Sequence, residues 1–126
     1  MVTLKDIQEA QALLRKIAVR TPLVLCKLSK ARHIFVKPEN LQPIGSFKLR
    51  GAYNKIHSLN AEQRSRGVVS HSSGNHAQGV AYAARALNVK ATIVMPRSAP
   101  AAWSWEAAAI SSAIFRVFPR PIISSP

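Results

Sequence analysis

Lys48 has the clearest chemical context of any side chain in this sequence. It lies in the segment 37–52, KPENLQPIGSFKLRGA, directly after Ser46 and Phe47 and just beyond a turn that contains Gly45. A lysine amine can bond covalently to an aldehyde when neighbouring groups hold the rest of the ligand in place. The spacing by itself is also typical of an exposed lysine in a helix, so a second group of residues is needed to decide between the two interpretations.

A second polar group follows in the segment 71–79, HSSGNHAQG, between an expected strand and an expected helix. Its central residues are Ser72, Ser73, Gly74, Asn75 and His76. Backbone amides at the start of a helix point outward and bind anions without a charged side chain. The alternative is that Ser73 or Asn75 only caps the helix, which is worth about 1 kcal/mol. The segment therefore predicts either an anion-binding loop or an ordinary helix cap.

The apolar pattern arranges both segments among alternating helices and strands. A capping-box pattern at Thr3 and Asp6 predicts a helix that runs to about Ile17 and ends before Pro22. The further expected helices cover residues 46–59, 73–87 and 99–113, and the expected strands cover residues 23–26, 33–37, 67–70, 90–95 and 114–118. Gly45 is expected in a turn that needs a positive φ. The alternation predicts parallel α/β units.

Composition limits the class of protein. The chain has 126 residues, enough for one small domain, and its net charge of +13 arises from 18 basic and 5 acidic residues. The basic residues are scattered along the chain, which argues against specific nucleic-acid binding. The single cysteine, Cys26, excludes an internal disulfide and suits a reducing compartment. Because no apolar leader and no stretch near the roughly 20 residues of a membrane span is visible, we expect a cytoplasmic chain.

The two segments together resemble the cofactor site of the fold-type II pyridoxal-phosphate (PLP) enzymes. SFKLRGA at residues 46–52 and SSGNH at residues 72–76 are similar to threonine/serine dehydratases (threonine ammonia-lyases) and serine racemases, and the similarity covers about residues 17–100. The resemblance implies a parallel-sheet, three-layer α/β fold of the tryptophan synthase beta-like superfamily, with pyridoxal 5'-phosphate as cofactor. It further implies a lyase of amino-acid metabolism that deaminates L-threonine or L-serine, by dehydration, to a 2-oxo acid and ammonia. Homo-oligomers are implied for full-length members, with a small amino acid as substrate and with neither nucleic acid nor a membrane as partner.

The resemblance also implies roles for individual residues. Lys48 would bond covalently to the cofactor aldehyde and later transfer the α proton of the substrate. Phe47 would pack near the face of the cofactor ring; ordinary core packing is the other interpretation, and the two are compatible. Asn75 would bond the phenolic oxygen of the cofactor, and Ser73 would be a second acid or base on the opposite face of the substrate. The substrate carboxylate would be held by the loop of Ser72, Ser73, Gly74, Asn75 and His76.

No metal site is predicted. His71 and His76 have no Cys, Asp or Glu beside them that could complete a set of ligands. We expect His76 to shape the loop and Arg50 to be structural.

The sequence departs from the family after about residue 100. Family members continue with a lysine-bearing helix, a GAEV-type strand and a glycine-rich loop that wraps the cofactor phosphate, whereas this chain has 5 glycines and ends in WSWEAAAISSAIFRVFPRPIISSP. We therefore expect residues 1–100 to be the N-terminal part of a PLP-dependent dehydratase-like domain. Residues 101–126 are expected to be a divergent, poorly ordered tail that a frameshift or a gene break would explain. The alternatives to a dehydratase fragment are a serine racemase-like enzyme, an inactive remnant and, least favoured, a basic protein that binds anions or nucleic acid.

Overall fold

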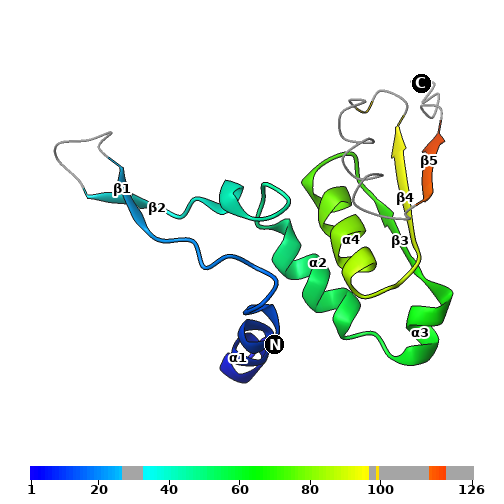
Figure 1. The fold of residues 1–126 in the computed structure, drawn as a ribbon, viewed down its shortest axis with the longest axis horizontal. Helices are drawn as coiled ribbons and strands as arrows, with labels where there is room; N and C mark the ends of the chain where they lie inside the picture. The colour runs from blue at the N-terminus through cyan, green and yellow to red at the C-terminus, as the bar shows by residue number, and fades with distance from the viewer. Residues whose placement is uncertain (27–32, 97–98, 100–113, 119–126) are drawn as a thin grey trace, which may run out of the picture.

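The computed structural model of the chain describes residues 1–26, 33–96, 99 and 114–118. Figure 1 shows the described elements in chain order, with a helical and sheet body on one side and a thin two-stranded ribbon on the other. The elements are α1 (Leu4–Leu14), β1 (Val24–Cys26), β2 (Ile34–Val36), the 3-10 helix η1 (Glu39–Leu41), α2 (Lys48–His57), α3 (Ala61–Arg66), β3 (Val68–His71), α4 (Asn75–Ala86), β4 (Ala91–Pro96) and β5 (Ile114–Phe118).

A parallel sheet forms the body of the described chain. Its strand order is β3-β4-β5, with Ser70 opposite Ile93 and Ile93 opposite Phe115. Helix α4 connects β3 to β4, which is the α/β unit that the alternation predicted. The expected strand at residues 114–118 is confirmed as β5.

For the first two strands, the prediction of parallel pairing is wrong. β1 and β2 pair antiparallel, with Val24 opposite Val36 and Cys26 opposite Ile34. A parallel crossover needs about a dozen residues or more, and too few residues separate these strands to supply one. The ribbon projects away from the body in Figure 1, and its side chains Leu25 and Phe35 are exposed.

The N-terminal helix begins as predicted and ends early. The Thr3 amide donates to the Asp6 carboxylate at 2.7 Å, and the Asp6 amide donates to Thr3 Oγ1 at 3.3 Å, so the capping box is confirmed. The amides of Ile17 and Ala18 both donate to the Leu14 carbonyl, at 3.0 and 2.9 Å. This tight turn replaces the last expected turn of the helix.

Helix α3 was not predicted, although its cap is visible in the sequence. The Asn60 side chain accepts from the Gln63 amide at 2.8 Å, and the Gln63 side chain accepts from the Asn60 amide at 3.0 Å. The helix ends at Gly67, whose φ of 81° favours glycine. A Cβ at this position would lie 2.8 Å from the Lys90 carbonyl oxygen, so Gly67 also permits the close approach of β3 and β4.

The core lies where α2 crosses α4 and where α4 covers the sheet (Figure 1). Small side chains dominate α4, so the helix can approach both neighbours closely. The buried residues of the larger cluster are Leu14, Ala52, Tyr53, Ile56, Val80, Ala83, Ala84, Val89 and Ala91. Those of the smaller cluster are Ala77, Ala81, Ile93 and Met95.

The remaining expectations fall largely outside this description. The expected helix at residues 99–113 and the expected poor order of the tail concern residues that lie almost entirely outside the described ranges. Within those ranges, no helix combines the length and the apolar character needed to cross a membrane.

Candidate functional site

Lys48 is the first residue of α2 and its side chain is exposed. Its Nζ lies 4.9 Å from the centroid of the Phe47 ring. Phe47 itself is 55% exposed, so the alternative of ordinary core packing is wrong within the described chain. The helix begins two residues later than predicted, because Ser46 stands outside it and accepts a hydrogen bond from the Lys48 amide at 3.4 Å.

The turn before α2 is fixed by Gly45 and Gln42. Gly45 has a φ of 68°, as predicted, and its amide donates to the Gln42 carbonyl at 2.7 Å. The buried Gln42 side chain accepts from the Val19 amide at 2.9 Å and donates to the Val19 carbonyl at 2.8 Å. This pair of bonds ties the turn to the segment that follows α1.

A carboxylate–guanidinium pair, the Glu39–Arg50 brace, joins the same turn to the first part of α2. Arg50 Nε donates to Glu39 Oε2 at 2.8 Å and Arg50 Nη2 donates to Glu39 Oε1 at 2.9 Å, a two-point contact that fixes geometry. Thr21 Oγ1 donates to the same carboxylate at 3.0 Å. The hydrogen bonds from Arg50 lower the pKa of Glu39 to about 2, with further help from Thr21 and Gln42 and against the opposing effect of burial.

The brace has structural consequences for Lys48. Arg50 Nη2 also donates to the Val19 carbonyl at 3.0 Å, so the segment after α1, the turn and α2 share one network. Lys48 lies within the helical turn that this network holds, two residues before Arg50. The structural role expected of Arg50 agrees with these contacts.

The second motif forms the connection from β3 into α4. The Ser72 amide donates to the Val94 carbonyl at 3.1 Å, and the Gly74 amide donates to Ser72 Oγ at 3.3 Å. Gly74 is the N-cap of α4, and no side chain caps this helix. The alternative in which Ser73 or Asn75 serves as the helix cap is therefore wrong.

The side chains of this loop are available to a ligand. Ser73, Asn75 and His76 are exposed, and Ser72 is half-buried. The loop follows the carboxyl end of β3, which is the edge of an open parallel sheet where ligands bind in α/β folds. Because the start of α4 is not capped by a side chain, its first amides remain suited to an anion.

A glycine contact brings the two motifs together. A Cβ at Gly79 would lie 3.1 Å from the Lys48 carbonyl oxygen and 3.3 Å from the Ala52 Cβ. Gly79 follows Asn75 by about one helical turn. The backbone of Lys48 therefore packs about one turn from the start of α4, although the two segments are far apart in sequence.

The residues present fit a cofactor that carries an aldehyde and an anionic group. An exposed amine, an exposed hydroxyl and an exposed carboxamide lie on adjoining helix starts, at Lys48, Ser73 and Asn75. The amine suits the aldehyde, and the uncapped amides of α4 suit an anion. This donor set is the chemical reason to compare the chain with known enzymes.

The family described as pyridoxal-phosphate dependent enzymes matches residues 14–115, which extends beyond the expected limit at residue 100. The L-threonine ammonia-lyase of Thermotoga maritima is 56% identical over 104 residues, 79% of this chain and 26% of that protein. The biosynthetic L-threonine dehydratase of Lactococcus lactis is 50% identical over 103 residues, 79% of this chain and 25% of that protein.

A solved structure of high similarity supports the same family. The serine racemase of Dictyostelium discoideum superposes with a TM-score of 0.87 at 39% identity, covering 96% of this chain and 40% of that one. The chain thus spans about a quarter of the length of the two curated relatives. Since the family matches most of the chain, and since the parallel α/β sheet and the lysine-bearing motif agree with it, this chain belongs to the pyridoxal-phosphate dependent enzymes of fold-type II.

Proposed function

We propose that this chain supplies the lysine-bearing part of a PLP-dependent ammonia-lyase that converts L-threonine or L-serine to a 2-oxo acid and ammonia. The observation that carries the proposal is the close packing of Lys48 against Gly79, beside an α4 start that no side chain caps. Identities of 56% and 50% to proteins named as threonine ammonia-lyase and threonine dehydratase support this substrate class.

Three residues would hold the cofactor. The Lys48 amine would bond covalently to the aldehyde carbon, and the exposed Phe47 ring, 4.9 Å from that amine, could cover a planar ligand. The exposed Asn75 carboxamide would bond the phenolic oxygen of the cofactor. When bound, PLP withdraws electrons from the α-carbon of an amino acid and so makes its α proton removable.

The chain's own groups then act on the substrate. The loop of residues 72–76 binds the substrate carboxylate through backbone amides at the start of α4. Once the substrate amine has displaced it from the aldehyde carbon, the freed Lys48 amine would accept the α proton, and the β-hydroxyl would leave with a proton as water. Water re-enters when the amino group is released, so the overall products are a 2-oxo acid and ammonia.

A serine racemase is the second candidate, favoured by the TM-score of 0.87 to the Dictyostelium enzyme. The Ser73 side chain is exposed and does not cap α4, so it is free of that structural role. In a racemase, Ser73 returns a proton to the face of the α-carbon opposite Lys48. The higher identities to the ammonia-lyases favour the first candidate.

We also propose a cytoplasmic setting and a homo-oligomeric full-length protein. A lone cysteine, half-buried at Cys26, suits a reducing compartment. The exposed apolar side chains of the β1–β2 ribbon suit burial in a larger assembly.

Product analysis tests these candidates. The purified chain is incubated with PLP and either L-threonine or L-serine, and 2-oxo acid, ammonia and D-serine are measured. We expect 2-oxo acid and ammonia in equal amounts. The Lys48→Ala variant should form neither product, whereas the matched surface variant Lys16→Ala should form both. D-serine without 2-oxo acid supports the racemase instead. PLP bound covalently at Lys48 without any product supports the inactive remnant and overturns the proposal.

A further inference from the structure

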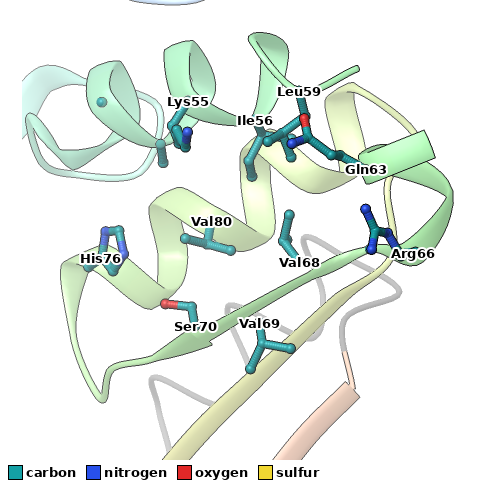
Figure 2. A pocket seen from close by; sticks show the side chains of 13 residues that line it. Lys55, Ile56, Leu59, Gln63, Arg66, Val68, Val69, Ser70, His76 and Val80 are labelled. Atoms are coloured by element: carbon teal, nitrogen blue, oxygen red, sulfur yellow. The ribbon is translucent and has the colours of Figure 1, made fainter. Parts of the chain in front are cut away.

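A groove that borders the candidate site, and shares His76 with it, opens between α2, α3, β3 and the first turn of α4. It has a volume of about 430 Å³, and Figure 2 shows the side chains that line it. None of Lys48, Ser73 and Asn75 is among its lining residues. Its size is within the roughly 300–1,000 Å³ of small-molecule sites.

The floor of the groove is apolar. Ile56 of α2 and Val80 of α4 form its base and are 4% and 6% exposed, and Val68 of β3 lies beside them (Figure 2). At Gly51, a Cβ would meet no atom within 4 Å, so the groove stays open along α2. A ligand with an aliphatic body would cover this floor and remove apolar surface from water.

Basic side chains stand at both ends of the floor. In Figure 2, Lys55 and His76 lie toward one end, and Arg66 lies toward the other. No Asp or Glu belongs to the lining that the structure describes. Lys55 takes part in none of the ion pairs found among the described residues.

Among the described residues, Glu62 pairs with Arg66 and competes with a ligand for it, but only weakly. Arg66 Nη2 lies 3.4 Å from Glu62 Oε1, and both side chains are mostly exposed, at 69% and 78%. Such surface pairs contribute little, so a ligand carboxylate can replace Glu62 at Arg66.

We propose that this groove binds an elongated aliphatic dicarboxylate, with one carboxylate at Lys55 and His76 and the other at Arg66. The charge complementarity of the two ends selects a dianion, and the apolar floor between them selects a body without polar groups. The inference uses neither Lys48 nor the cofactor, so it can hold without the proposed function, although the groove shares His76 with the loop assigned to the substrate carboxylate. His76 belongs both to the groove and to the loop of residues 72–76, so an occupied groove is expected to be sensed at that loop.

Calorimetric titration with the unbranched dicarboxylates from succinate to suberate tests the site. We expect saturable binding of at least one member, with shifts of the NMR signals of His76 and Val80. Hexanoate, a monocarboxylate of similar body, should bind at least about tenfold more weakly, because one charged end stays unpaired. Lys55→Ala and Arg66→Ala should each weaken binding about tenfold, whereas Lys16→Ala, which removes an exposed lysine elsewhere, should not.

A plugged groove separates loss of the site from loss of the fold. Gly51→Leu places a side chain in the open space beside α2, and leucine favours a helix more than glycine does, so the fold is retained. Its circular dichroism should match the parent chain while dicarboxylate binding disappears. The proposal is overturned if no member of the series binds saturably, or if binding survives Gly51→Leu, Lys55→Ala and Arg66→Ala.

Discussion

The Glu39→Gln substitution removes the charge whose contribution to stability follows most directly from the structure. The Glu39 side chain is 18% exposed and its partner Arg50 is 33% exposed, so solvent screens the pair only in part. A Glu39 pKa lowered from 4.5 to about 2 corresponds, at about 1.4 kcal/mol for each tenfold change, to about 3 kcal/mol of folding free energy at neutral pH. Glutamine can still accept from Thr21 and Arg50, so we expect the variant to lose about 2 kcal/mol.

The stabilisation from Glu39 should depend on pH, and the direction follows from its lowered pKa. The pKa of Glu39 is lower in the folded chain than in the unfolded chain, so the stabilisation is fully present above about 4.5 and disappears as the pH falls toward about 2. The difference in unfolding free energy between the parent chain and Glu39→Gln should therefore shrink over this range.

Urea unfolding followed by circular dichroism measures the difference at neutral pH and at steps down to about 2. Glu9→Gln is the matched control, because its 3.9 Å pair with Lys5 is exposed and should change stability by less than about 0.5 kcal/mol. Equal stability of Glu39→Gln and the parent chain at neutral pH would refute the reasoning. So would a deficit that stays constant on acidification.

Four further substitutions test the packing of the helices and strands and the exposure of the ribbon. Gly51→Ala should stabilise the chain by about 0.5–1 kcal/mol, since its Cβ meets open space. Gly79→Ala should not give this stabilisation, because its Cβ would press against the Lys48 carbonyl. Thermal unfolding compares the two variants, and an equal gain in stability at both positions would contradict the close contact. Gly67→Ala should destabilise by more than about 1 kcal/mol, because φ is positive and the Lys90 carbonyl lies 2.8 Å from the new Cβ; an unchanged melting temperature would count against this. Phe35→Ser on the exposed ribbon should lower self-association in sedimentation velocity while leaving the unfolding free energy within about 0.5 kcal/mol, and a large stability loss would show that the ribbon is packed.

The sequence was sufficient where structure follows from local patterns. The capping box at Thr3, the positive φ of Gly45 and the order of helices and strands around β3 and β4 depend on residues close together in the chain. The two motifs also indicated the family, because their residue types are specific. Asn60 and Gln63 carried an equally local signal for α3, and that signal was missed.

The contacts that hold the site together could not be read from neighbouring residues. Gln42 bonds Val19 from 23 positions away, and Arg50 bonds Glu39 from 11 positions away across the turn between η1 and α2. Such pairs depend on how the chain folds back on itself, for which one sequence gives no periodic signal. The packing of Gly79 against Lys48 is likewise a tertiary fact, which no spacing predicts.

Borohydride reduction of the chain after incubation with PLP tests the role of Lys48 most directly. Reduction makes the bond between a lysine amine and the cofactor permanent, so peptide mass spectrometry can locate it. We expect the reduced pyridoxyl group at Lys48, with little at the exposed Lys16 and Lys90, and no preferred position in the Lys48→Ala variant. A label spread evenly over the exposed lysines, or one that Lys48→Ala leaves unchanged, would contradict the assignment of Lys48 as the residue that holds the cofactor.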